Sequence, residues 1–267
     1  MNHLHRELAP ITAEGWAEIE DEASQNLRRL LAGRKLFDFE GPHGWEQAAI
    51  NLGYVEALRQ TPVDGSSVQR RLVQPLIEAR IPFAVERSEL EAAARGAPDT
   101  DMDPVAEAAR KAALLEDDVL FNGYAAAGIT GVMQTSEHEP MTIDEDYSHY
   151  PALVAAACDQ LRQAGVEGPY AIGLGPRCYT GLSRTTEQGY PVMEHVRRMV
   201  SGPIVWAPAI DGAVVMSLRG GDFVLHVGQD FSIGYSHHDA SQVQLYIQTS
   251  FTSLVFGPEA AVPLRHE

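Results

Sequence analysis

Three consecutive residues near the C-terminal end of this 267-residue chain could bind a metal ion: His237, His238 and Asp239. Imidazole and carboxylate groups are common ligands of zinc and related ions. Adjacent residues on a strand point to opposite faces, however, and no HxxxH or HExxH helical spacing lies nearby. We therefore interpret this group as a polar turn between two strands and expect no metal site in the chain.

A second group of side chains with chemical potential is the acidic run Glu116, Asp117 and Asp118. Neighbouring carboxylates can share a proton and act as an acid and a base. These three lie in a predicted helix, where successive residues diverge by about 100°. The spacing therefore favours a solvated or ion-paired helix face over a catalytic pair.

The third group, Gly173, Gly175 and Cys178, lies just after a predicted strand. A dinucleotide-binding loop would need its third glycine at position 178, which is a cysteine, and the sequence contains no GxxxxGK[ST] phosphate loop. No GxSxG motif occurs either, and Cys178 has no recognisable nucleophile context. We predict no catalytic residue and no cofactor, and we do not expect an enzyme.

The elements that would position these residues are predicted to be helices in the first part of the chain and mainly strands in the last part. Apolar residues at steps of three and four predict helices over residues 12–32, 104–124 and 151–165. Thr12 is a suitable N-cap for the first helix, and Gly33 is placed to end it in a left-handed conformation.

Residues 41–75 and the C-terminal hundred residues have a different character. Glycine and proline interrupt residues 41–75, which predicts an extended arm that must dock on its own subunit or on a neighbour. Short β-type runs follow at residues 170–174, 204–206, 213–218, 223–227, 243–247 and 251–256. Gly220-Gly221 is expected to be a hairpin turn. Helices and strands do not alternate regularly, so we predict an α+β fold.

Composition excludes several classes of protein. Hydrophobic residues make up 45% and charged residues 21%, as in ordinary globular proteins. The formal charge of −17 disfavours nucleic acid and anionic membranes as partners. The two cysteines, Cys158 and Cys178, have no CxxC spacing, and we find no signal peptide or membrane-spanning run. We expect a soluble, cytoplasmic protein.

Seven blocks, taken in order, are more specific than any of these fragments. They are LHRELAP (residues 4–10), GRKLFDFEGPHGW (33–45), GVEGPY (165–170), GYP (189–191), WAPAI (206–210), RGGDF (219–223) and GQDFSIGY (228–235). In this order and at this spacing the chain closely resembles, end to end, the encapsulins, which are the shell proteins of bacterial and archaeal nanocompartments.

The resemblance implies the HK97-like fold of tailed-phage major capsid proteins. We expect a peripheral (P) domain, an axial (A) domain and an extended loop (E-loop). The expected divisions are residues 1–47 (P domain with an N-terminal cargo-binding helix), 48–75 (E-loop), 76–135 (P domain with the spine helix), 136–225 (A domain) and 226–267 (P domain, C-terminal strands).

The resemblance also implies a function. Encapsulins assemble into an icosahedral shell, expected here to have about sixty copies in a T=1 arrangement. They hold a cargo enzyme by its C-terminal targeting peptide and pass small solutes through pores. The cargo would be a dye-decolorising peroxidase or a ferritin-like iron-storage protein, enclosed in a cytoplasmic nanocompartment. The alternatives are a phage or prophage major capsid protein and, less favoured, a protease or bacteriocin.

Two sets of residues fall where the family places its functional sites. Leu31, Arg34 and Asp38 correspond to the cargo-peptide groove. The five-fold pore loop corresponds to Ser183, Arg184, Thr185, Thr186, Glu187, Gln188, Gly189 and Tyr190. A ring of Glu187 carboxylates around a symmetry axis would favour cations.

Overall fold

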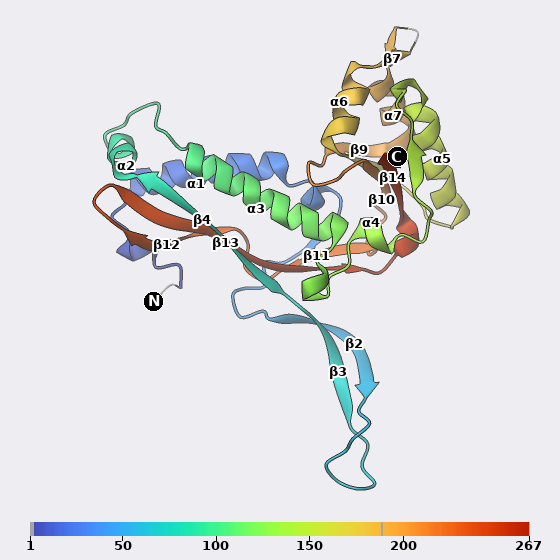
Figure 1. Ribbon diagram of the computed structural model, residues 1–267, viewed down its shortest axis with the longest axis horizontal. Helices are drawn as coiled ribbons and strands as arrows, with labels where there is room; N and C mark the ends of the chain where they lie inside the picture. The colour runs from blue at the N-terminus through green and yellow to red at the C-terminus, as the bar shows by residue number, and fades with distance from the viewer. Residues whose placement is uncertain (1–2, 188, 267) are drawn as a thin grey trace.

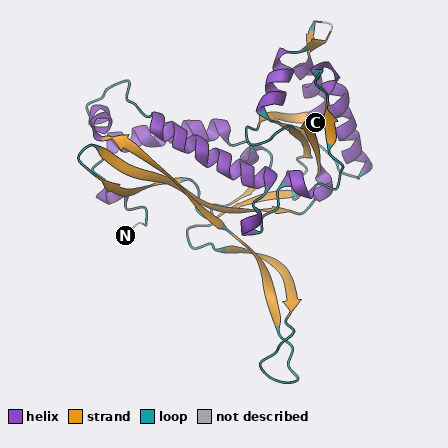
Figure 2. Ribbon diagram, viewed as in Figure 1, coloured by secondary structure: helices purple, strands orange, loops and turns teal. Residues whose placement is uncertain are grey.

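The computed structural model describes residues 3–187 and 189–266. It consists of two sheet-containing units and a protruding two-stranded arm (Figures 1 and 2). The helices are α1 (Ala13–Leu30), α2 (Arg87–Ala94), α3 (Asp103–Asn122), α4 (Val132–Thr135), α5 (Tyr150–Gln163), α6 (Pro176–Arg184) and α7 (Val192–Val200). The strands are β1 (Asp38–Glu40), β2 (Ala49–Ala57), β3 (Gln69–Pro75), β4 (Ile77–Glu86), β5 (Met141–Ile143), β6 (Tyr170–Leu174), β7 (Thr186–Glu187), β8 (Tyr190–Pro191), β9 (Ser201–Trp206), β10 (Ala213–Ser217), β11 (Phe223–Val227), β12 (Ser232–His238), β13 (Gln242–Val255) and β14 (Ala261–His266).

The first unit is built around the long strand β13. β4 pairs with one edge of β13, while β12 and β11 pair with successive parts of its other edge, and β1 adds in parallel to β11. The helices α1 and α3 lie along this sheet (Figure 1). Buried apolar side chains of α1 and α3, such as Ile19 and Ala109, share a core with Val243 and Leu245 of β13.

The first predicted helix is confirmed at its start and corrected at its end. Thr12 caps α1 by accepting a hydrogen bond from the Gly15 N–H at 3.3 Å. Gly33 does not adopt the expected left-handed conformation; it opens a short 3-10 turn. A Cβ atom at Gly33 would lie 2.2 Å from Leu120 Cδ1, so the glycine is needed for space and not for its backbone angles.

The second unit contains the sheet β5-β14-β10-β6-β9, which α5, α6 and α7 surround (Figure 1). β10 pairs antiparallel with both β6 and β14. β14, which belongs to the segment 226–267 expected in the P domain, thus pairs within this second sheet and not with β12 or β13. The predicted strands ended at residue 256, so β14 was not among them, and its pairing with β10 had no signal in the sequence pattern.

The Gly220-Gly221 turn also differs from the prediction. Both glycines have positive φ angles, 87° and 83°, as expected of a tight turn. The strands that they connect, β10 and β11, belong to different sheets. The turn is therefore a crossover between the two units and not a hairpin.

The arm is the antiparallel pair β2–β3, which projects away from both units (Figure 1). Several of its large apolar side chains face solvent: Tyr54 is 73% exposed and Val63 is 65% exposed. A lone two-stranded ribbon is only marginally stable in water, so this surface needs a partner. Within the described ranges, no helix is long and apolar enough to cross a membrane.

Candidate functional sites

A groove of about 590 Å³ runs between α1 and the β12–β13 edge of the first sheet. Its floor is apolar and is formed by side chains from both elements, including Ala23, Leu27, Phe231, Ile233 and Ile247. Charged side chains border it: Arg6, Glu20, Arg28, Arg34, Lys35 and Asp230. An apolar floor with a charged rim suits an extended peptide, because side chains enter the floor while the rim fixes its direction.

Leu31 and Arg34 both line this groove. Leu31 directly follows α1 as its C-cap residue and is 6% exposed, so it forms part of the floor near the core. Arg34 follows in the 3-10 turn and lies between the groove and α3. Its guanidinium donates two hydrogen bonds to Glu116, at 2.8 and 2.9 Å, and one to Asp230 Oδ1 at 2.7 Å. Arg34 therefore ties α3 to the chain that precedes β12.

The acidic run on α3 also holds the segment that follows α1. Glu116 and Asp117 are fully buried. Asp117 accepts the backbone N–H groups of Ala32 and Gly33 at 2.9 and 2.8 Å. Burial raises the pKa of Asp117 to about 7, although these two hydrogen bonds oppose that rise. The predicted ion-paired face is thus correct for Glu116, but the spacing of the acidic run did not predict that this carboxylate is buried.

Asp38 lies outside this groove. Its carboxylate accepts the Gly221 N–H at 2.6 Å. It lines a smaller pocket that also includes Leu36 and Phe223. The structure therefore brings Leu31 and Arg34 together and places Asp38 at the junction of β1 with the crossover turn.

The predicted pore loop lies at the far tip of the second unit (Figure 1). Ser183 and Arg184 end α6, while Thr186, Glu187 and Tyr190 contribute to the two short strands β7 and β8. Gln188 lies outside the described residues. The remaining members of the loop are Thr185 and Gly189.

Contacts with α7 hold this loop in place. Glu187 lies 3.4 Å from His195 Nδ1, and the Tyr190 ring stacks on the His195 ring with a centroid separation of 4.8 Å. Arg198 donates a hydrogen bond to the Tyr190 hydroxyl at 3.0 Å. These contacts tie the Glu187–Tyr190 pair of β7 and β8 to α7, and half of the Glu187 side chain (47%) faces solvent.

The three residues His237, His238 and Asp239 lie where β12 connects to β13. His237 and His238 end β12, and the Asp239 carboxylate accepts backbone N–H groups of Ser241 and Gln242 in the turn to β13. Asp239 lies in the predicted polar turn, whereas the two histidines belong to the strand that precedes it.

Comparison with known proteins places the chain in a family. A family model described as "Encapsulating protein for peroxidase" matches residues 1–252. The chain is 52% identical to the type 1 encapsulin shell protein of Rhodospirillum rubrum, over 99% of this chain and 97% of that protein. It is 44% identical to the type 1 encapsulin shell protein of Mycobacterium tuberculosis over the full length of both. The chain belongs to the type 1 encapsulin shell proteins.

Solved structures agree on the fold. The virus-like particle from Pyrococcus furiosus aligns with a TM-score of 0.63 at 15% identity, over 92% of this chain and 98% of that one. Gordonia phage Cozz aligns with a TM-score of 0.56 at 11% identity, over 89% and 87% of the two chains. The predicted HK97-like α+β capsid fold is confirmed.

Membership of the encapsulin family also bears on the alternative functions, which were a phage or prophage capsid protein and a protease or bacteriocin. The relatives are named as shell proteins and not as enzymes, so the prediction of a non-enzyme is confirmed and a protease is disfavoured. The Gordonia phage protein is 11% identical to this chain and shows only the fold, whereas the shell protein of Rhodospirillum rubrum is 52% identical.

Proposed function

We propose that this encapsulin-family chain closes into an icosahedral shell of about sixty copies (T=1) that holds a cargo enzyme on its inner surface. Small solutes would pass through pores while the cargo stays inside. The family model's description makes a peroxidase the favoured cargo, and a ferritin-like iron-storage protein is the second candidate. The compartment would be an encapsulin nanocompartment in the cytoplasm.

The observation that carries the shell proposal is the arm. Its exposed apolar side chains, among them Tyr54 and Val63, have no cover from their own chain within the described residues. In a closed shell each arm would lie on a neighbouring subunit and bury this surface. Identical chains joined by head-to-tail contacts form a closed shell when the rotations between neighbouring subunits are those of a closed point-group symmetry. No separate scaffold is needed for this.

We propose the groove between α1 and β12–β13 as the seat of a cargo peptide. Leu27, Leu31 and Phe231 supply an apolar floor, and Arg28 and Lys35 supply positive charge on its rim. A short peptide with apolar side chains and a neighbouring carboxylate matches this surface. Asp38 is omitted from this proposal, because its carboxylate is engaged by Gly221 in a separate pocket.

We propose that the loop of residues 183–190 lines a pore at the five-fold axis, with Glu187 giving it a preference for cations. We also assign the sheet around β13, with α1 and α3, to the P domain. The arm β2–β3 is the E-loop, and the sheet that contains β6 and β10 forms the A domain. In this arrangement the tip of the A domain carries the pore loop.

The native mass of the purified chain, expressed alone, tests the shell proposal. About sixty chains of 29.1 kDa make a particle of about 1.7 MDa, measurable by light scattering with negative-stain images as a check on shape. A larger uniform particle would retain the shell and reject the copy number. A monomer or dimer over a range of salt concentrations would refute the proposal.

A further inference from the structure

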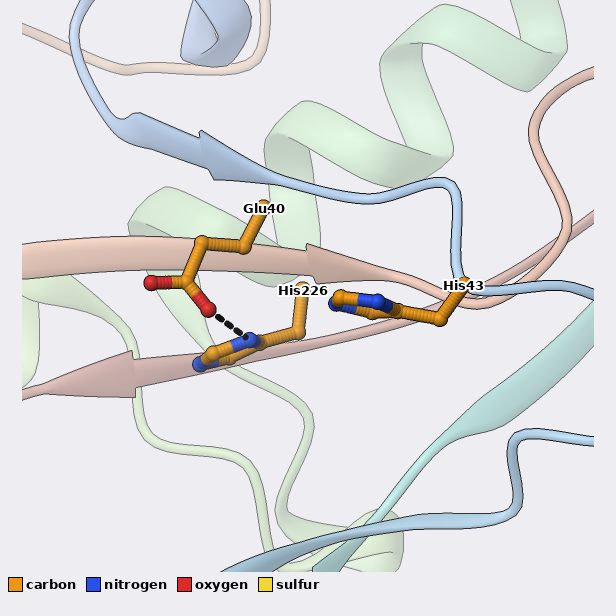
Figure 3. A group of neighbouring side chains, drawn as sticks. All are labelled: Glu40, His43 and His226. Atoms are coloured by element: carbon orange, nitrogen blue, oxygen red, sulfur yellow. Dashed lines mark ion pairs between the residues drawn. The ribbon is translucent and has the colours of Figure 1, made fainter.

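Glu40, His43 and His226 bring three possible metal-ligand atoms together at the base of the arm. One carboxylate oxygen and one ring nitrogen from each histidine all lie within 4.8 Å of one another. Figure 3 shows the three side chains converging, with Glu40 from β1, His43 from the turn after it and His226 from β11. None of them belongs to the groove, the arm or the pore loop.

The backbone holds these three residues in position. Glu40 is the register partner of His226 in the parallel β1–β11 pair. Beyond β1, the His43 N–H donates to the Val227 carbonyl at 3.0 Å, and the Gly44 N–H donates to the Gly228 carbonyl at 2.7 Å. The chain that carries Glu40 and His43 is therefore fastened along β11 on both sides of the cluster. Ligands held in this way lose little freedom when an ion binds.

His226 provides the second, independent observation. Its side chain is only 9% exposed, and its Nδ1 atom makes no hydrogen bond within residues 3–187 and 189–266. That nitrogen lies 3.1 Å from Glu40 Oε2, a close approach without hydrogen-bond geometry. A buried polar atom without a partner is costly unless something occupies the space in front of it.

We propose that Glu40, His43 and His226 form a binding site for a divalent transition-metal ion of the zinc type. Zinc binds imidazole nitrogen at about 2.0–2.1 Å and carboxylate oxygen at about 2.0–2.2 Å, so two ligand atoms of a tetrahedral site lie about 3.3 Å apart. The observed 3.1 Å between Nδ1 and Oε2 is close to this value. Two histidines and one carboxylate leave at least one coordination position open to water or a small ligand.

The test uses the assembled full-length shell, freed of metal with EDTA and dialysed. Titration with ZnCl₂ by calorimetry is expected to give about one Zn²⁺ per subunit, and Co²⁺ is expected to give the visible absorption of a nitrogen- and oxygen-ligated site. His43→Ala and Glu40→Gln change exposed residues and are expected to weaken Zn²⁺ binding by about tenfold or more.

A matched control comes from a second histidine–carboxylate pair. His149 Nδ1 lies 3.0 Å from Asp144 Oδ2, and both side chains are largely exposed. His149→Ala is expected to leave Zn²⁺ affinity and stoichiometry unchanged. Equal binding by wild type, His43→Ala and Glu40→Gln would overturn the proposal.

A second measurement is the control for whether Zn²⁺ can enter the closed shell. Shells produced in zinc-supplemented medium are purified and digested, and their zinc content is measured. A content well below one Zn²⁺ per subunit, together with no binding in the titration, would also overturn the proposal. Particle mass is measured on the same samples, so a failure of assembly is distinguished from a failure to bind metal.

Discussion

Arg34 and Glu116 form a two-point ion pair in which the Glu116 side chain is fully buried and the Arg34 side chain is 19% exposed. The pair joins the turn after α1 to the middle of α3. The same guanidinium reaches Asp230, next to the start of β12. One arginine therefore fixes the relative positions of the helix and the sheet edge that form the two sides of the groove.

Replacing Arg34 with Met is expected to destabilise the protein by about 3–5 kcal/mol, because Glu116 would remain buried without its partner. The measurement is the midpoint of thermal unfolding of the purified shell. Arg110 and Glu107 provide the control, since they make the same two-point pair on the exposed surface of α3. Arg110→Met should change the midpoint little. Equal effects of the two substitutions would contradict the role given to burial.

Asp117 is expected to make stability depend on pH. Its pKa is raised from 3.8 to about 7 by burial. Between these values the folded chain holds a proton that the unfolded chain releases, so this contribution stabilises the fold at low pH and is lost as pH rises toward 7. The midpoints of thermal unfolding, measured between pH 5 and pH 8, should change less with pH in Asp117→Asn than in wild type. Asp118→Asn, at an exposed neighbour, should retain the wild-type slope; the same slope in all three proteins would refute the prediction.

Leu27→Glu is expected to abolish cargo loading while leaving the shell intact, because it places a charge on the apolar floor of the groove. The assay co-expresses the shell with a fluorescent protein that carries the C-terminal peptide of a dye-decolorising peroxidase, and measures fluorescence per particle. Gln25→Glu adds the same charge to an exposed position of α1 outside the groove and should load normally. Undiminished loading of Leu27→Glu would place the peptide elsewhere.

Tyr54→Ser is expected to impair assembly, because the arm loses apolar surface that a neighbouring subunit would cover. Light scattering should show a larger share of small species than in wild type. Glu56→Gln, at an exposed position of the same strand, should assemble as wild type does. Normal particles from Tyr54→Ser would mean that this side chain is not part of a subunit contact.

Glu187→Lys is expected to slow the influx of divalent cations, because it reverses the charge of each loop around the pore. The rate at which Co²⁺ quenches a fluorophore trapped in the lumen measures this influx. Asp159→Lys reverses a charge on α5, outside the loop, and should have little effect. An unchanged rate in Glu187→Lys would remove Glu187 from the permeation path.

Local features of the fold were predictable, and long-range pairings were not. Thr12 capped its helix as its residue type predicts, and the apolar periodicity located α1, α3 and α5. Gly33 was misread because sequence spacing identifies a glycine after a helix, but only the packing of Leu120 shows why glycine is needed there. β14 was not predicted as a strand, and its pairing with β10 joins segments far apart in the sequence that no local pattern connects.

The candidate sites show the same limit. The resemblance to encapsulins located Leu31 and Arg34, which the structure places in one groove, but it also included Asp38, which the structure places in another pocket. Glu40, His43 and His226 were missed, since 183 positions separate His43 from His226 and no local spacing motif connects them. A parallel pairing of β1 with β11 was needed to bring them together.

The return strand of the arm has a mechanical consequence. β3 ends at Pro75 and β4 begins at Ile77, so the arm continues almost directly into a strand that pairs with β13 from Ile77↔Phe251 to Glu86↔Gln242. Hydrogen bonds in an antiparallel pair are perpendicular to the strands. Tension applied along the arm therefore loads this whole row of bonds in shear at the same time. Peeling them one after another would require a sideways force, so the arm is anchored most firmly along the direction in which it points.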